Sequence, residues 1–279
     1  MSRKKAKKRR GRIAPPPLIR FAGHWHAPSQ GAELLAPALA DVCERLHIQV
    51  SDIRRIAVVR GPGSFTGIRL ALATASGLAR ATGAETGGID YLPLLAASTH
   101  AALAPALAVS AQTSPKLSGP ALLFALTHAR RDLLHMQGFS AEQHGRPTAL
   151  TGILVLSPAE AAKRIAEIRL LHENTPEFAG LPPRVLLLGS GLSRNRARIG
   201  EALREQGLAD AILLPETYDH PSHEALLGAA ATAVYGKDDI APLYARPSDA
   251  EENLDRIAAG LGLDPASART RLGDLTGQG

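Results

Sequence analysis

Cysteine is almost absent from this sequence, and aromatic residues are scarce. Cys43 is the single cysteine in 279 residues, which excludes an internal disulfide and fits a reducing compartment, the cytoplasm. It shares a helical pattern with Val42 and Leu46 and is expected to be a small core residue rather than a nucleophile. Phe, Trp and Tyr make up 4% of the chain, so its cores must be built from Leu, Ala, Ile and Val. No apolar run approaches the about 18 residues of a membrane span.

Acidic residues are missing from the start of the chain, where eight basic residues crowd together. Removing these eight charges from the net charge of +6 leaves −2, so the remaining chain is nearly neutral. We expect residues 1–17 to form a basic disordered tail that could neutralise RNA phosphates; a solvated tail and a misassigned start codon are the alternatives. An apolar stretch typical of a secretory signal does not precede the prolines at 15–17. The basic residues are Arg3, Lys4, Lys5, Lys7, Lys8, Arg9, Arg10 and Arg12.

A glycine-rich turn is the most informative feature that the sequence does contain. It lies between an apolar strand pattern, Ile56 to Val59, and an amphipathic helix pattern, Ile68 to Thr82. Such a strand–turn–helix junction can hold an anion at the helix N-terminus, although plain turn chemistry is the favoured explanation. No Lys follows the last glycine, which excludes a Walker A loop. The turn consists of Gly61, Pro62, Gly63, Ser64, Phe65, Thr66 and Gly67.

The chain body divides into two similar halves. In the first, we expect a strand at Leu18 to Ala22, a helix at Gly31 to Leu46, the junction just described, a short strand at 87–89 and a helix at 91–103. Pro37 removes a hydrogen bond from the first of these helices unless it lies in the first turn. The domain boundaries predicted are a first lobe at 18–107, a linker at 108–120, a second lobe at 121–220, a returning helix with the closing segment at 221–249, and an extension at 250–279.

The second half predicts three strands followed by alternating helices and strands. The strands are expected at 121–127, 133–139, 153–156, 185–188 and 211–214, and the helices after Ser157, at 195–206 and at 222–235. Ser157 and Glu160 form a capping box with Pro158 at the first helical position. This order of elements is ribonuclease-H-like, and the first half repeats it without its opening strands.

The string GPGSFTGIRLALATASGLA resembles the signature of the TsaB (YeaZ) family, the bacterial dimerisation subunits of the tRNA N6-threonylcarbamoyladenosine machinery. The run Leu34-Leu35-Ala36-Pro37 is similar to the family's Leu-Leu-Pro helix, and Ala129-Arg130-Arg131 stands where the family has an Asp-Ala-Arg turn. Leu188-Gly189-Ser190-Gly191 follows a further strand, and Pro242 to Arg246 resembles the closing Pro-x-Tyr-Leu-Arg. The resemblance covers about Ser29 to Pro247.

The resemblance implies an α/β fold of two tandem ribonuclease-H-like lobes, the actin-like ATPase architecture, with the last helix packed on the first lobe. It also implies a non-catalytic scaffold that pairs with a TsaD-like threonylcarbamoyl transferase and with a TsaE-like P-loop ATPase. ATP and metal are then expected on those partner subunits, with no catalytic residue and no metal site in this chain. The implied partner interface comprises Leu34, Leu35, Leu39, Ile68, Ala73, Ser76, Gly77 and Arg80.

The chain departs from the family pattern at its start. The family opens with a strand that carries Asp-Thr-Ser, and here the basic tail and three prolines occupy that place. Without a central strand, the neighbouring strand keeps an unpaired edge. His128 stands where the family commonly has Asp, so no acid function is expected there. An actin-like ATPase or small-molecule kinase that uses the 61–67 turn, and a decayed paralogue, are the competing hypotheses.

Four other polar features suggest chemistry only weakly. His24 and His26 flank Trp25 but lack a third ligand at metal-binding spacing, so exposed loop residues are the expectation. His220 to His223 fits turn and capping chemistry before a helix. Ser64 lacks the glycine spacing of a nucleophile elbow. The basic residues Arg194, Arg196 and Arg198 are expected on a solvated helix face, with a patch toward tRNA as the alternative.

Overall fold

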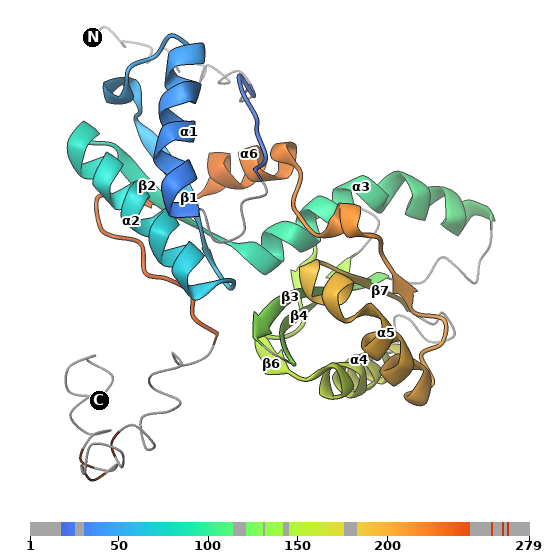
Figure 1. Cartoon of the computed structure of the whole chain (residues 1–279). Coiled ribbons are helices and arrows are strands. Elements are labelled where there is room, and N and C mark those ends of the chain that lie inside the picture. The colour runs from blue at the N-terminus through green and yellow to red at the C-terminus, as the bar shows by residue number, and fades with distance from the viewer. Residues whose placement is uncertain are drawn as a thin grey trace, which may run out of the picture.

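The computed structural model describes two α/β lobes joined by a long helix (Figure 1). It describes residues 18–25, 31–113, 121–130, 132–141, 145–175 and 183–245, with residues 258, 264 and 267. The basic tail, Arg131, Arg246 and nearly all of the 250–279 extension lie outside the described residues. None of the described helices is long and apolar enough to cross a membrane.

The first lobe is a small sheet flanked by helices. Strand β1 pairs in parallel with β2, and the short strand β9 from the end of the described chain adds antiparallel to β2. The order is therefore β1-β2-β9, with β1 at one edge. Its elements are α1 (Gly31–Arg45), the 3-10 helix η1 (Val50–Asp52), β1 (Arg55–Gly61), α2 (Phe65–Thr82), β2 (Glu85–Asp90) and β9 (Tyr235–Gly236).

Local sequence signals set both ends of α2. The Ser64 side chain accepts a hydrogen bond from the Gly67 backbone N–H and caps the first turn. Gly83 ends the helix in the left-handed conformation, with φ of 72°, and its N–H reaches Ala79 O. By contrast, α1 continues through Pro37, in its second turn, where the helix loses one backbone hydrogen bond.

The second lobe is a six-stranded mixed sheet. The order is β5-β4-β3-β7-β8, with β6 also paired to β4. β4 runs antiparallel to β3 in a hairpin, whereas β7 is parallel to β3 and β8 is parallel to β7. The strands are β3 (Ala121–Arg130), β4 (Leu133–Ala141), β5 (Thr148–Ala149), β6 (Leu154–Leu156), β7 (Arg184–Leu188) and β8 (Ile212–Leu213).

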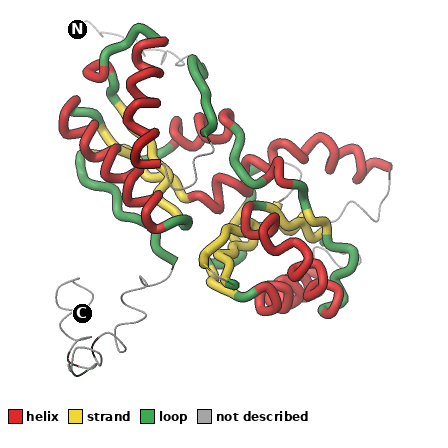
Figure 2. Tube along the Cα trace, viewed as in Figure 1, coloured by secondary structure: helices red, strands yellow, loops and turns green. Residues whose placement is uncertain are grey.

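Helices cover both faces of this sheet, and one of them belongs to the first half of the chain. α4 (Pro158–Glu173) and α5 (Ser190–Glu205) pack on one face around Phe124, Leu126 and Ile165. α3 (Tyr91–Thr113) covers the other face, where Leu92 and Leu95 meet Phe139. In Figure 2 the strands form two groups, one in each lobe, with helices around each. β3 is buried from Ala121 to Thr127, as expected for a central strand covered on both faces.

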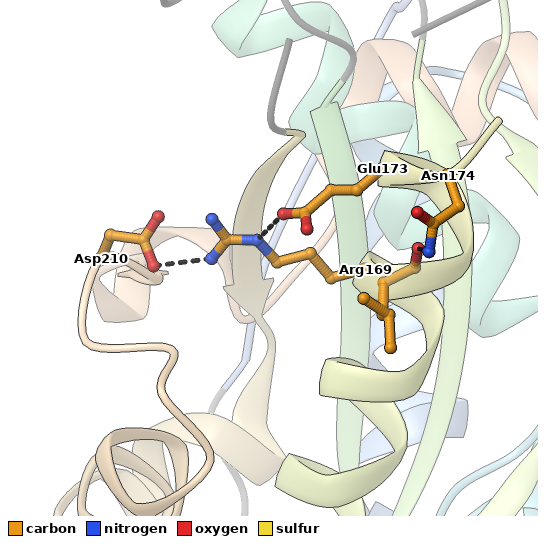
Figure 3. A network of polar contacts seen from close by, with 5 residues as sticks. Arg169, Glu173, Asn174 and Asp210 are labelled. Atoms are coloured by element: carbon orange, nitrogen blue, oxygen red, sulfur yellow. Dashed lines mark hydrogen bonds and ion pairs between the residues drawn. The ribbon is translucent and has the colours of Figure 1, made fainter. Parts of the chain in front are cut away.

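An ion-pair network ties the end of α4 to the loop before β8 (Figure 3). Arg169 contacts Glu173 at 2.8 Å and Asp210 at 2.7 Å. Asn174 closes the helix by donating its side-chain N–H to Leu170 O. Both carboxylates raise the pKa of Arg169, with the hydrogen bond to Asp210 the larger cause. The network fixes α4 against the segment that follows α5.

Most predicted elements are present, and four differ. The strand predicted at Leu18 to Ala22 is wrong, because this segment has no regular structure and no strand pairs with it. α3 continues to Thr113, through half of the predicted linker, and residues 114–120 lie outside the described residues. α5 begins at Ser190, within the second glycine turn and five residues before the predicted start at Asn195. The predicted helix at 222–235 is shorter, since α6 (His223–Thr232) ends before β9.

Candidate functional site

The 61–67 turn joins β1 to α2 and packs against the closing segment of the chain. Gly61 has φ of +123°, and a Cβ there would lie 2.6 Å from Leu243 O, so no side chain fits. The Leu243 N–H donates to Arg60 O at 2.8 Å. The Ser64 hydroxyl caps the N-terminus of α2, as plain turn chemistry predicts. The turn and the segment around Pro242 are therefore one structural unit.

An aromatic and cationic cluster covers this junction. Phe65 and Tyr244 stack with ring centroids 5.1 Å apart. The Arg69 guanidinium lies 3.8 Å from the Phe65 ring centroid, and its Nε donates to the Tyr244 hydroxyl at 2.9 Å. Sequence reasoning recognised both motifs but missed their contact, because 175 residues separate Arg69 from Tyr244. Each motif ends with an arginine close to an aromatic residue. This shared feature is the signal that could have suggested the contact between the two motifs.

A cleft of about 720 Å³ separates this turn from the second lobe. The N-termini of α2 and α5 both border it, together with the end of β3. Helix N-termini favour anions, and among the described lining residues the charged side chains are Arg130 and Arg194, with no carboxylate. The cleft thus suits an anionic group better than a magnesium ion held by protein oxygens. Its polar and charged lining residues are Ser64, Thr66, Tyr91, Thr127, His128, Arg130, Ser190 and Arg194.

Burial shifts several pKa values around the cleft. Desolvation, helped by the Arg194 charge, lowers the pKa of His128, and its Nδ1 is buried without a partner among the described atoms. Desolvation raises the pKa of Asp219, opposed by the Ser193 hydroxyl, which donates to it at 2.8 Å. Tyr91 donates to Asp219 O at 2.9 Å, and burial raises the pKa of Tyr91 to about 12. The lowered pKa favours the neutral form of His128, and both His128 and Arg194 line the cleft.

The second glycine turn packs directly on β3. Gly189 has φ of +99°, and a Cβ there would lie 2.2 Å from Leu126 O. A Cβ on Gly191 would lie 2.9 Å from the Thr127 carbonyl carbon. Both positions need glycine because the α5 N-terminus approaches the β3 backbone. This contact sets the far wall of the cleft.

The residues predicted for a partner interface fall into three groups. The prediction that Ile68 lies on the surface is wrong, because its side chain is only 8% exposed. It packs against the inner side of the 61–67 turn. Ser76 and Arg80 are held within the chain, each 2.8 Å from an Asp239 oxygen. The remaining predicted residues are half-buried or exposed on α1 and α2: Leu34, Leu35, Leu39, Ala73 and Gly77.

Gly77 separates two explanations of the small residues on α2. Packing against another helix within the chain would place atoms near a Cβ at this position, yet none of the described atoms lies within 4 Å of it. Ala73, one turn earlier, is exposed. α1 contacts α2 on the same side of the lobe (Figure 1). Ala73 and Gly77, which we call the α2 stripe, therefore face outward, beside the apolar residues of α1.

The other candidate groups have structural roles. Cys43 is half-buried on α1. His24 packs against the His220 ring at 4.9 Å, and His26 lies outside the described residues. Among the described residues, no three His, Cys, Asp or Glu side chains are grouped to hold a metal ion. Arg196 donates to the carbonyls of Leu213 and Leu214, and Arg198 pairs with Asp132, so of the three arginines only Arg194 lines the cleft.

Comparison with known proteins gives consistent matches. Residues 26–124 match the family model of TsaD, tRNA N6-adenosine threonylcarbamoyltransferase. The chain is 25% identical over 153 residues to the Escherichia coli K12 tRNA threonylcarbamoyladenosine biosynthesis protein TsaB, a match that covers 55% of each chain. It is 41% identical over 44 residues to TsaB of Buchnera aphidicola, covering 16% of this chain and 20% of that one. The chain thus spans about half the length of the first relative and a fifth of the second.

Two solved structures share the fold. A Pseudomonas aeruginosa protein described as similar to the peptidase YEAZ aligns with a TM-score of 0.50 at 22% identity, covering 78% of this chain and 86% of that one. YeaZ from the same organism aligns with a TM-score of 0.50 at 21% identity, covering 79% and 87%. These matches show a mixed α/β fold like that of the YeaZ structures.

Proposed function

Starting from the confirmed similarity of this chain to the TsaB (YeaZ) family, we propose that it acts in tRNA threonylcarbamoyladenosine biosynthesis as a non-catalytic subunit. In this role it binds a TsaD-like threonylcarbamoyl transferase, which carries the metal and the substrates. The observation that carries the proposal is the outward-facing stripe of α2 in a chain whose named relatives work in this pathway. A TsaE-like ATPase would join the pair in the cytoplasm, and the basic tail would contact tRNA phosphates.

We further propose that both lobes are ribonuclease-H-like units of an actin-like architecture. The second lobe supports this through its order β5-β4-β3-β7-β8, in which β4 alone of the long strands runs antiparallel to β3. The first lobe supports it only in part, since its sheet order is β1-β2-β9. The exchange of α3 and α6 between the lobes fits a tandem arrangement, because α3 packs on β3 and α6 packs on α3 and β2.

The proposed docking surface combines two neighbouring helices. Leu34, Leu35 and Leu39 contribute the apolar part from α1, whereas Ala73 and Gly77 allow close approach along α2. Glycine in a helix interior costs about 1 kcal/mol relative to alanine, and no contact within the described chain offsets that cost at Gly77. A partner helix that packs closely on this stripe would supply the missing contacts.

The alternative function is an ATPase or small-molecule kinase that binds phosphate at the 61–67 turn. The cleft favours it through two helix N-termini and two arginines. The absence of carboxylates from its described lining disfavours it, because a nucleotide-bound Mg²⁺ usually contacts at least one. Magnesium-dependent ATP turnover by the purified chain alone would support this alternative and contradict the non-catalytic proposal.

Co-expression with the threonylcarbamoyl transferase subunit of the same organism tests the proposed pairing. We expect a one-to-one complex by size exclusion with light scattering. Ala73→Arg and Gly77→Leu should abolish it while the chain stays soluble and folded. Ala197→Arg is the matched control, since Ala197 is also exposed on a helix but lies on α5 in the second lobe. Complex formation by the α2 variants equal to that of the control would refute the surface, and no complex with any variant would favour a decayed paralogue.

A further inference from the structure

The two lobes repeat one chain order, and the repeat exposes a vacant strand position. In the second lobe the order is α4, β7, a glycine turn, α5, β8 and α6; in the first it is α1, β1, a glycine turn, α2, β2 and α3. β7 is flanked by β3 on one side and by β8 on the other. β1, its counterpart, pairs with β2 alone among the described strands. The other edge of β1 therefore lacks the neighbour that β7 has in β3.

Burial of the surrounding elements agrees with a missing strand. β7 is buried from Val185 to Leu188, whereas every residue of β1 before Gly61 is half-buried or exposed. α4 buries five residues, whereas its counterpart α1 has none that is fully buried among those described. α6 is apolar and also buries none fully. The elements that would enclose a strand beside β1 are thus present but incompletely covered.

The same chain carries a segment suited to fill this position. Residues 18–25 include Leu18, Phe21 and Trp25, which are 76%, 40% and 50% exposed. The segment has the residue types of a strand, yet no backbone hydrogen bond links it to another described element. Within its own chain, the His24 ring packs on the His220 ring, 4.9 Å between centroids, shortly before α6. An unpaired, apolar segment and an unpaired strand edge are complementary.

We propose that two copies of this chain exchange residues 18–25, so that each copy adds a strand to the open edge of β1 in the other. Backbone N–H and C=O groups along β1 would pair with the incoming strand, as in β-strand addition. Because side chains alternate along a strand, Phe21 and Trp25 would leave water on one face of the extended sheet and Leu18 on the other. Exchange of a short segment is a low-cost route to a symmetric dimer. The new backbone hydrogen bonds would use groups that make none in the monomer, and neither lobe would have to change shape. This surface is separate from the α2 stripe that the proposed function uses.

The single tryptophan makes the proposal directly measurable. Trp25 is the only tryptophan in the chain, and it lies in the exchanged segment. We expect its emission to shift to shorter wavelength as the concentration of the full chain rises, in step with a change from monomer to dimer mass by light scattering. Hydrogen exchange should slow in parallel at the amides of β1, while those of β7 stay unchanged.

Matched variants test the same idea. Phe21→Asp should move the midpoint of the emission shift at least about tenfold higher in concentration, because an apolar contact is lost at both copies of the site. Leu171→Asp is the control, since Leu171 is 65% exposed on α4. A monomer mass at all concentrations overturns the proposal, as does an emission shift that is independent of concentration, which would mean docking within one chain. A dimer without added protection of β1 overturns it too, because the copies would then meet elsewhere, for example at α2.

Discussion

Replacing Gly77 with alanine should stabilise the isolated chain and weaken its proposed pairing. The residue lies inside α2, its backbone is helical, and an added Cβ meets no described atom within 4 Å. Alanine is favoured over glycine by about 0.8–1 kcal/mol in a helix interior, chiefly because the unfolded chain loses freedom. For a chain of this size that gain raises the midpoint of thermal unfolding by about 2–4 °C.

Gly83, at the end of the same helix, gives a matched control. A Cβ there also meets no atom within 4 Å, but φ is +72°, where an L side chain is strained. Gly83→Ala should therefore destabilise the chain by about 1–2 kcal/mol, although the space around both glycines is open. Circular dichroism melts of the two variants measure both values. A destabilised Gly77→Ala variant would refute the open-stripe description, and equal effects of both changes would refute the role of backbone conformation.

Three further outcomes follow from the site. Gly189→Ala should destabilise the second lobe by about 2–6 kcal/mol, through backbone strain and overlap with a β3 carbonyl 2.2 Å away, as measured by urea unfolding. His128 has a lowered pKa when folded, so its contribution to the free energy of unfolding is present above about pH 6.5 and is lost as pH falls below that; His128→Gln should flatten this part of the stability profile. Tyr244→Phe removes the acceptor of Arg69 and should cost less than about 1 kcal/mol, whereas Tyr244→Ala also removes stacking on Phe65 and should cost clearly more in thermal melts.

Local signals predicted much of the fold. The alternation of apolar strands with capped helices located β1, β3, β4, β7 and the start of α4, because these patterns act within a few residues. Ser157, Glu160 and Pro158 made the α4 start readable, and both halves of their capping box are present. The 61–67 turn could be located from the sequence because its glycines, too, are a local signal.

Features that depend on contacts between distant parts of the chain could not be predicted from the sequence. Leu18 to Ala22 has strand composition but pairs with none of the described strands, and propensity alone does not form a sheet. The contact of Arg69 with Tyr244 depends on the path of the closing segment across the first lobe. Ile68 and Gly77 share a helix and a similar pattern, yet one faces inward and the other outward, which only the packed lobe decides.

The crossing of α3 and α6 between the lobes has a consequence for synthesis on the ribosome. α3 leaves the exit tunnel before β3 and β4, the strands whose apolar face it covers, have been made. It is rich in Leu and Ala and has no strongly polar face. Its apolar surface therefore stays exposed while about thirty further residues emerge. The first lobe waits longer still, because α6 and β9 come near the end of the chain. The second lobe therefore has all of its strands and covering helices once β8 has been made, whereas the sheet of the first lobe is completed only by β9.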